Sequence, residues 1–208
     1  MMKYKHAAFL IFAKAPVEGL VKTRLIPALG REGATRLYRK LLHDLLNGLA
    51  EEKLAAIELW CAPDSTHQDF QAVNRLPGLT LHEQQGDDLG ERMAHAVVDA
   101  LPRHRHLVLL GVDCPALTMP MLEQVFQWLA EGMDAVLGPA EDGGYVLLGL
   151  NQTADCLFQG IPWGAEVVGQ MTRQCLLKMQ WEWRELPELW DLDRPEDLLR
   201  LEADKFSI

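Results

Sequence analysis

The hydrophobic residues of this chain fall into two patterns, short uninterrupted runs and longer stretches with helical spacing. Uninterrupted runs of strand length are typical of strands that are buried on both faces of a sheet. Apolar residues that recur three or four positions apart indicate helices with one buried side. The expected strands are 7–13, 56–61, 79–82, 107–112, 135–139, 145–150 and 181–186, and the expected helices are 31–50, 64–74, 88–101, 118–132, 166–179 and 194–203.

These strands and helices alternate with short connections, which is the pattern of an α/β domain with a mostly parallel, doubly wound sheet. We see no domain boundary and expect residues 1–208 to form a single domain, in which 139–165 forms a small flap over the site. Right-handed crossovers bring the carboxyl ends of parallel strands to one edge, where ligands of open α/β sheets bind. The loops expected at this edge are 14–27, 84–90, 113–117 and 140–144.

Composition and charge narrow the class of protein. The chain has 208 residues, of which 49% are hydrophobic, and this suffices for a sizeable core. A formal net charge of −10 argues against non-specific binding to nucleic acid. The apolar run at 7–13 is too short to span a membrane and no cleavage pattern follows it, so we expect a cytoplasmic protein. The sequence does not fix the oligomeric state, and a homo-oligomer is compatible with it.

The cysteines favour a reducing compartment. None of Cys61, Cys114, Cys156 and Cys175 belongs to a Cys-x-x-Cys pair, so neither a zinc site nor a redox motif is expected. We therefore expect four free thiols. Cys114 also invites a nucleophile hypothesis, which has little support because no base is evidently paired with it.

The loop after the first strand carries the candidate phosphate-binding residues Lys14, Lys22, Thr23 and Arg24. Phosphate oxygens are bound by guanidinium forks, ammonium groups and backbone N–H groups, all of which this loop could supply. It is not a P-loop, because Val21 stands where that motif needs glycine. The alternative is a solvated basic loop.

Acidic residues follow both the fourth and the last expected strand. Asp113 comes directly after the apolar run 107–112, and the segment 190–198 contains Asp193 and Asp191. Carboxylates that meet at one sheet edge make a hard, oxygen-rich site for Mg²⁺ or Mn²⁺, which uses few protein ligands together with substrate phosphates. Our expected metal pair is Asp113 with Asp193, and Asp191 is less favoured. The alternative roles are a turn cap for Asp113 and a helix cap for Asp193.

Two further turns could contact a ligand. The turn with Asp142, Gly143 and Gly144 before Tyr145 is typical of a β-hairpin, and it could also bind sugar hydroxyls with its carboxylate. The segment 84–92 begins a helix. Asp87 or Asp88 is its natural N-cap, and this helix end could also receive an anion or a nucleobase edge.

Short segments over nearly the whole chain carry a resemblance, which is specific in combination although no single motif is. They are Phe12-Ala13-Lys14-Ala15-Pro16 with Gly19, Lys22-Thr23-Arg24-Leu25, Asp88-Leu89-Gly90 with Arg92, Gly111-x-Asp113-Cys114-Pro115, Gly138-Pro139 with Asp142-Gly143-Gly144-Tyr145, Pro162-Trp163-Gly164, and Asp191-x-Asp193 with Pro195-Glu196-Asp197-Leu198. In this order they resemble the glycosyltransferase-A superfamily of nucleotide-diphospho-sugar transferases and nucleotidylyltransferases. The chain looks most similar to a bacterial family labelled radical-SAM/selenodomain-associated transferase, or arsenosugar biosynthesis glycosyltransferase.

The resemblance implies the superfamily's fold and a nucleotide bound over the first loop. It implies phosphate contacts from Lys22 and Arg24 and a turn near the base that includes Asp88, Leu89 and Gly90. Two departures concern the phosphates and the metal. Nucleotidylyltransferases have Gly-Thr-Arg where this chain has Lys22-Thr23-Arg24, and the segment after the fourth strand lacks the second acid of an Asp-x-Asp motif.

For the remaining ligands the resemblance implies a cation, Mg²⁺ or Mn²⁺, on Asp113 and Asp193. It also implies that the Asp142 turn, with Gly143, Gly144 and Tyr145, faces the sugar or the acceptor. If the reaction inverts the sugar's configuration, Asp142 is the candidate base.

Three functions are compatible with these features. The leading hypothesis is a metal-dependent transferase that moves a sugar from a nucleotide-sugar donor to a small-molecule acceptor. The alternatives are a nucleotidylyltransferase, which transfers NMP from an NTP to a phosphorylated acceptor, and a non-catalytic nucleotide-binding protein.

Overall fold

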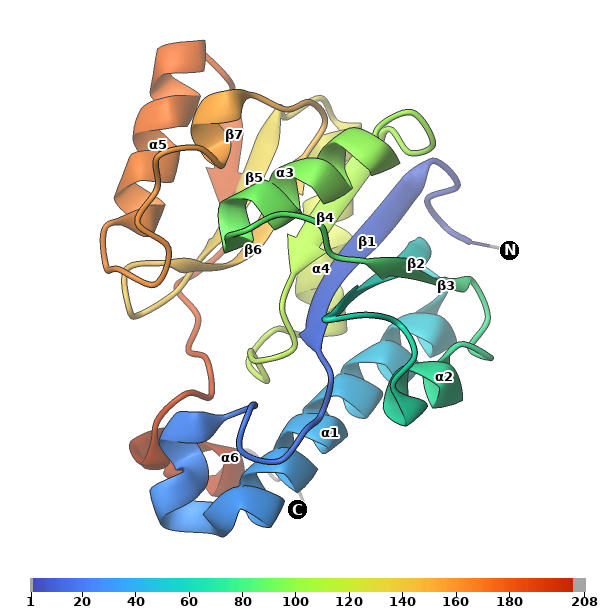
Figure 1. Cartoon of the computed structure of the whole chain (residues 1–208). Coiled ribbons are helices and arrows are strands. Elements are labelled where there is room, and N and C mark those ends of the chain that lie inside the picture. Colours follow the sequence, from blue (N-terminus) through green and yellow to red (C-terminus); the bar gives the residue numbers. More distant parts are fainter. Residues whose placement is uncertain (1, 204–208) are drawn as a thin grey trace.

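The structure is a computed structural model that describes residues 2–203. One seven-stranded sheet lies between two layers of helices, with the strand order β3-β2-β1-β4-β6-β5-β7 (Figure 1). Only β6 runs antiparallel to its neighbours β4 and β5. The prediction of an α/β fold with a mostly parallel sheet is confirmed. The strands are β1 (Ala7–Lys14), β2 (Ala56–Ala62), β3 (Leu79–Glu83), β4 (His106–Leu110), β5 (Ala135–Pro139), β6 (Tyr145–Leu150) and β7 (Trp183–Glu185).

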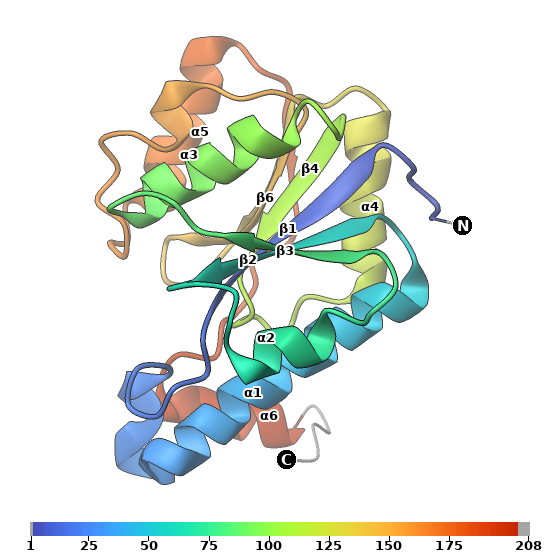
Figure 2. The same ribbon diagram turned by 45° about the vertical axis from the view of Figure 1, so that its right-hand side comes forward.

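Helices cover both faces of the sheet (Figure 2). Apolar residues of α1, α2 and α4 form one core with the sheet, and those of α3 and α5 form a second core on the opposite face. No helix within residues 2–203 is both long and apolar enough to cross a membrane. The helices are α1 (Ile26–Glu52), α2 (Gln68–Val73), α3 (Leu89–Ala100), α4 (Met119–Ala130), α5 (Val168–Met179) and α6 (Leu198–Ala203), with the 3₁₀ helices η1 (Thr23–Leu25), η2 (Asp155–Leu157) and η3 (Pro195–Asp197).

A third, smaller core lies beyond the carboxyl edge of the sheet. There, η1 and the first turns of α1 pack against the C-terminal segment and α6, as the lower part of Figure 1 shows. Leu25 and Leu192 are completely buried in this cluster, and Leu201 almost completely. The small core therefore anchors the C-terminal segment beside the first loop.

Element boundaries differ from the sequence-based expectation in several places. The first helix begins at Ile26 instead of Arg31, and Gly30 (φ 70°, ψ 170°) interrupts its helical backbone. The second helix begins at Gln68 instead of Asp64, and it is capped by His67, whose ring accepts from the N–H of Asp69. Strand β4 ends at Leu110, so Asp113 lies in the loop beyond it. These local errors leave the order of the elements unchanged.

The expectation of four free thiols is wrong. Cys156 and Cys175 form a disulfide, and only Cys61 and Cys114 are free. The bond joins η2 to α5 across 19 positions of sequence. Because pairing depends on spatial proximity, the absence of a Cys-x-x-Cys motif did not exclude it.

A buried carboxylate lies in the α3-side face of the sheet. The side chain of Glu58 on β2 is only 4% exposed. Arg103 Nη2 lies 3.0 Å from Glu58 Oε1, and His104 Nε2 lies 3.0 Å from the same oxygen. Burial raises the pKa of Glu58, but the hydrogen bonds from His104 and Arg103 outweigh it and hold the pKa below its ordinary value.

We predict that Arg103→Met lowers the free energy of unfolding by about 3 kcal/mol, because it leaves a buried carboxylate without its main counter-ion. Arg184→Met is the matched control. Its partner Glu131 is 45% exposed, and we expect a loss below about 1 kcal/mol. Urea unfolding of both variants measures the difference.

The pairing of Glu58 with Arg103 also predicts how the stability of the fold depends on pH. A carboxylate with a lowered pKa stabilises the fold above its unfolded pKa and loses this contribution as the pH falls through its folded pKa. The wild type should therefore keep the contribution down to about the ordinary glutamate pKa of ~4.3 and lose it below. Arg103→Met should raise the pKa of Glu58, so its loss of stability at low pH should be smaller than that of the wild type, and the difference in stability between the two proteins should narrow as the pH falls and Glu58 is protonated. Equal pH profiles would contradict this assignment.

Candidate active site

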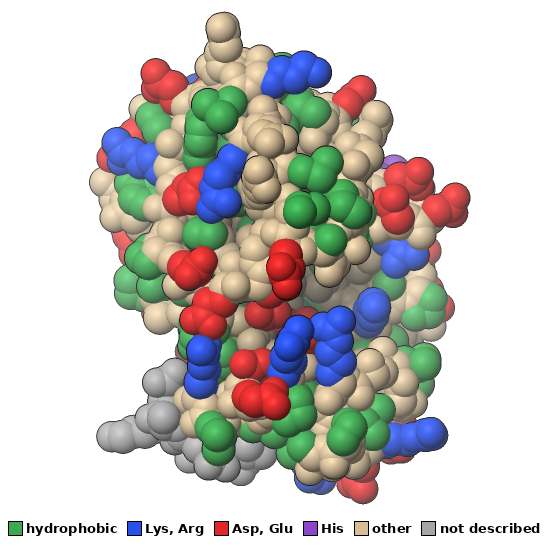
Figure 3. All heavy atoms as spheres, turned by 90° about the vertical axis from the view of Figure 1, so that its left-hand side faces the viewer, with side chains coloured by type: hydrophobic (Ala, Val, Ile, Leu, Met, Phe, Trp, Pro, Cys, Tyr) green, Lys and Arg blue, Asp and Glu red, His purple; other side chains and the backbone are tan. Residues whose placement is uncertain are grey.

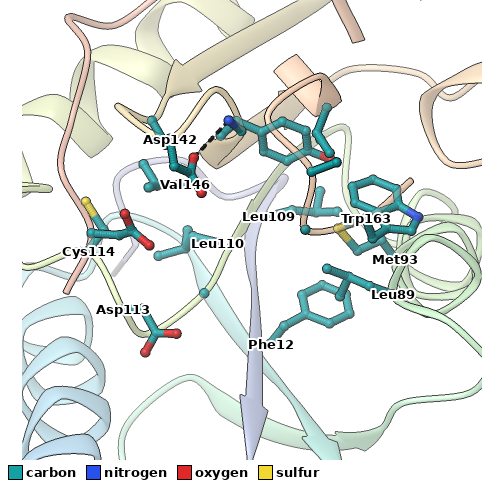
Figure 4. A pocket seen from close by; sticks show the side chains of 18 residues that line it. Phe12, Leu89, Met93, Leu109, Leu110, Asp113, Cys114, Asp142, Val146 and Trp163 are labelled. Carbon is teal, nitrogen blue, oxygen red and sulfur yellow. Dashed lines mark hydrogen bonds between the residues drawn. The ribbon is translucent and has the colours of Figure 1, made fainter. Parts of the chain in front are cut away.

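A cavity of about 340 Å³ opens at the carboxyl edge of the sheet, where the ends of β1, β4 and β5 meet the start of α3. Its two ends differ in chemistry (Figure 4). Asp113 and Asp142 lie at one end, whereas Phe12, Leu89 and Trp163 lie at the other. The cavity could therefore hold a ligand with a polar part and an apolar part.

Among the residues that the structure describes, three carboxylates and no lysine or arginine line this cavity. They belong to Asp113, Asp142 and Asp191. Burial, followed by the negative charge of Asp142, raises the pKa of Asp191. Carboxylates that repel one another in a half-buried cavity favour a cation or hydrogen-bond donors as ligands.

The hairpin turn between β5 and β6 is fixed by close packing against α5. Asp142 Oδ1 accepts a hydrogen bond from the N–H of Gly144 at 2.8 Å, drawn as the dashed line in Figure 4. Gly143 has φ 85°, and a Cβ atom at this position would lie 2.2 Å from the carbonyl oxygen of Glu166. The N–H of Gly169 donates to the Gly143 carbonyl at 2.9 Å. The hairpin prediction is confirmed, and the protein's own backbone fills the space beside Gly143.

The apolar end of the cavity depends on a second close approach. A Cβ atom on Gly90 would lie 2.3 Å from the Phe158 carbonyl oxygen and 2.4 Å from Trp163 Nε1. The segment between η2 and α5 therefore packs directly on the first turn of α3. Tyr145 packs edge-on against Trp163, with ring centroids 6.3 Å apart. The buried polar atoms of both side chains have no hydrogen-bond partner among the described residues.

The cations of the first loop contact acidic residues at the same edge. The Lys22 side chain is only 3% exposed, and its Nζ lies 2.8 Å from Asp113 Oδ1. Arg24, whose side chain is 66% exposed, pairs with Asp193. Figure 3 shows Lys and Arg side chains along the lower rim of a hollow in this face, with acidic side chains above and below them. Lys14 and Thr23 are exposed.

The turn before α3 serves mainly as a helix cap. Asp88 Oδ1 accepts from the N–H of Glu91 at 2.8 Å, and Glu91 Oε2 in turn accepts from the N–H of Asp87 at 2.8 Å. Leu89 lines the cavity directly. The N-cap expected from the sequence is confirmed, and a contact to a nucleobase stays a prediction.

Cys114 lies in the cavity wall but is poorly suited to act as a nucleophile. Its thiol donates to the carbonyl oxygen of Trp190 at 3.3 Å. Burial raises the pKa of the thiol to about 12, so the reactive thiolate is scarce at neutral pH.

The structure thus brings several predicted residues together and separates others. Asp113, Asp142, Gly144 and Tyr145 share the cavity, whereas Asp193 lies outside its lining. Phe12, Met93 and Val168 also line the cavity, although we expected no role for them from the sequence, and Asp191 lines it in place of the favoured Asp193. Trp163, which we expected only as part of the Pro162-Trp163-Gly164 motif, lines the apolar end of the cavity.

Within residues 2–203, one group of three side chains brings possible metal-ligand atoms within 4.8 Å of one another. It consists of Glu58, His82 and Asp99, away from the cavity. Arg103 already bridges Glu58 and Asp99 there, at 3.0 and 2.7 Å. This group was not predicted, and Arg103 already forms ion pairs with both of its carboxylates.

The chain is similar to one protein family and to several solved structures. Residues 45–165 match the family described as "Uncharacterized protein conserved in bacteria (DUF2064)". Comparison with curated proteins gives no match. The crystal structure of a "putative nucleotide-diphospho-sugar transferase" from Desulfovibrio desulfuricans G20 is similar, with 33% identity and a TM-score of 0.88 over 98% of this chain and 89% of that chain.

More distant structures share the fold alone. A 4-diphosphocytidyl-2C-methyl-D-erythritol synthase from Anaerococcus prevotii has a TM-score of 0.61 at 10% identity, with 96% of this chain and 98% of that chain covered. A cytidylyltransferase from Leptospira borgpetersenii has a TM-score of 0.57 at 12% identity, with coverages of 98% and 86%. The fold is therefore that of nucleotide-diphospho-sugar transferases.

We predict that Gly143→Ala destabilises the protein more than Gly160→Ala. Both positions have positive φ, but a Cβ atom on Gly160 meets nothing within 4 Å. The backbone strain common to both should cost about 1–2 kcal/mol. The contact with Glu166 should add about 1–3 kcal/mol in Gly143→Ala alone. Equal midpoints of chemical unfolding would refute the packing role of the turn.

Proposed function

The chain belongs to the DUF2064 family, and from this premise and the geometry of the cavity we propose that it is a nucleotide-utilising glycosyltransferase. It would transfer a sugar from a nucleotide-diphospho-sugar donor to a small-molecule acceptor. The observation that carries the proposal is the cavity itself, in which carboxylates and an aromatic wall lie beside a cationic loop. The similarity to the Desulfovibrio protein supports the same class of reaction.

The donor's phosphates would lie against the first loop. The exposed guanidinium of Arg24 can form two parallel hydrogen bonds to phosphate oxygens, and Lys14 and Thr23 are exposed beside it. Negative charge develops on the diphosphate as the sugar leaves, and fixed cations stabilise it. Lys22 was expected to share this role, but its burial favours a different one.

The residues of the cavity fit a divalent cation. Asp113 is half exposed, and the pKa of Asp191 is raised first by burial and then by the negative charge of Asp142, a repulsion that a cation would relieve. Mg²⁺ and Mn²⁺ are typically held by one or two carboxylates together with substrate phosphates. Asp113 would be one ligand, with Asp193 as the expected partner and Asp191 as the one that faces the cavity. Such a cation supplies Lewis-acid stabilisation of the leaving diphosphate.

The sugar and the acceptor would occupy the cavity. Sugar hydroxyls are donors that suit the carboxylates of Asp142 and Asp191, and the C–H face of a sugar suits Trp163 and Tyr145. Asp142 Oδ2 would accept the proton of an acceptor hydroxyl if the reaction inverts the sugar's configuration. Gly143, Gly144 and the segment 158–165 would shape this part of the site, whereas residues 145–150 of the expected flap form strand β6 inside the sheet.

Nucleotidyl transfer is the second candidate, because structures of cytidylyltransferases share the fold. The products distinguish the reactions. Glycosyl transfer releases a nucleoside diphosphate, whereas nucleotidyl transfer releases pyrophosphate.

The proposed partners are small molecules, and a homo-oligomer stays a prediction. So does a cytoplasmic location. The Cys156–Cys175 disulfide argues against a cytoplasmic location, because disulfides are rare in reducing compartments.

We predict that a panel of nucleoside diphosphates and nucleotide sugars with Mn²⁺ contains a ligand that stabilises the protein. At about 100 times its Kd, such a ligand adds about 2.7 kcal/mol to the free energy of unfolding. Thermal denaturation with each compound measures the shift. No shift with any nucleotide would refute the proposed function.

Arg24→Gln should weaken the binding of the best nucleotide by about tenfold or more, because it removes a charge-assisted hydrogen bond. The control Arg75→Gln changes an exposed arginine in the connection between α2 and β3, outside the cavity lining, and should leave the Kd unchanged. Isothermal titration measures both. A non-catalytic binding protein would instead bind nucleotide but release no product, and Asp113→Asn would change nothing.

A further inference from the structure

Lys22 differs from the other cations of the first loop in its surroundings. Its side chain is 3% exposed, against 66% for Arg24 two positions later. Its backbone adopts the left-handed conformation with φ 48°, which non-glycine residues rarely adopt. This conformation turns the chain just before η1. Because the side chain is almost completely buried, the ammonium group is enclosed by protein.

Two acceptors from distant parts of the chain surround this ammonium group. Nζ lies 2.8 Å from Asp113 Oδ1 in the loop after β4, and it donates to the carbonyl oxygen of Leu192 in the C-terminal segment. The contact with Asp113 is an ion pair, because Asp113 Oδ1 has no hydrogen-bond partner among the described residues, and the ammonium group donates its hydrogen bond to Leu192. A buried charge requires such partners, so Lys22 is costly to withdraw from them.

The same three segments are joined by further contacts. The N–H of Leu192 donates to the Asp113 carbonyl at 2.8 Å, and the Cys114 thiol donates to the Trp190 carbonyl. Leu192 itself is completely buried in the small third core with Leu25. Lys22 thus closes a junction of the first loop, the β4 loop and the C-terminal segment. Asp113 and Asp191, which both line the cavity, lie at this junction.

We infer that Lys22 is a positioning residue that acts through Asp113, and not a ligand of the donor's phosphates. Its ammonium group balances the charge of Asp113 and holds the C-terminal segment against the β4 loop. The carboxylates of Asp113 and Asp191 thereby keep their places in the cavity wall, where Figure 4 shows Asp113 at the polar end. The catalytic consequence rests on the proposed function, whereas the structural consequence does not.

These two cations of the first loop thus have different roles, because Lys22 is buried and Arg24 is exposed. Arg24 pairs with Asp193, which is 36% exposed, so solvent or a phosphate can replace this partner. Lys22 cannot exchange its partner in this way, because its side chain is only 3% exposed. Methionine is a suitable substitute, because it is unbranched and only one atom shorter than lysine, and because Asp113 is already half exposed to water.

The test compares Lys22→Met, Asp113→Asn and the double variant, with Arg24→Met as the matched control in the same loop. We expect Lys22→Met to lower kcat by about tenfold or more while the metal-free Kd of the nucleotide changes by less than about twofold. In the Asp113→Asn background, Lys22→Met should change kcat by less than about twofold, because both substitutions remove the same contact. Arg24→Met should instead raise the Kd.

A tenfold rise in the Kd of Lys22→Met, together with additive effects on kcat, would make Lys22 a phosphate ligand and overturn the inference. The second readout is amide hydrogen exchange at Leu192, which needs no substrate. Lys22→Met should speed this exchange by about tenfold or more, and Arg24→Met should not. Unchanged exchange in Lys22→Met would also overturn the inference. A wild type that binds no nucleotide would refute only the proposed function.

Discussion

The contact between the buried ammonium group of Lys22 and the carboxylate of Asp113 joins the parts of the candidate site. The sheet brings the ends of β1, β4 and β5 to one edge and holds the C-terminal segment as far as Leu189, which pairs with Ala140, but it does not hold the residues that follow Leu189. That segment is held by Leu192, whose side chain fills the small third core and whose carbonyl accepts from Lys22. Removing this junction would leave the main sheet intact and the cavity wall incomplete.

A second constraint is the close approach of backbone to backbone around the cavity. The hairpin turn rests on the start of α5 at Gly143, and the Trp163 segment rests on α3 at Gly90. Neither position has space for a side chain. The Cys156–Cys175 disulfide connects the beginning of this wall to α5. The polar and apolar ends of the cavity are thus held by separate parts of the fold.

The sequence predicted the elements well because buried parallel strands and amphipathic helices have distinct hydrophobic periods. It could not predict that β6 lies between β4 and β5, since periodicity does not specify strand partners. For the site, the spacing of the motifs identified the loops, and the resemblance supplied the roles. The pairing of Lys22 with Asp113, and the position of Asp191 in the lining in place of Asp193, depend on how the C-terminal segment folds back. No local pattern encodes that path.

The most direct measurement is a crystal structure of the protein soaked with Mn²⁺ and a nucleoside diphosphate. Our account predicts that the cation binds Asp113 and the diphosphate contacts Arg24, while the Lys22 ammonium group keeps its contacts with Asp113 and Leu192. A nucleotide bound away from this edge, or Lys22 turned out of the junction onto the phosphates, would contradict it.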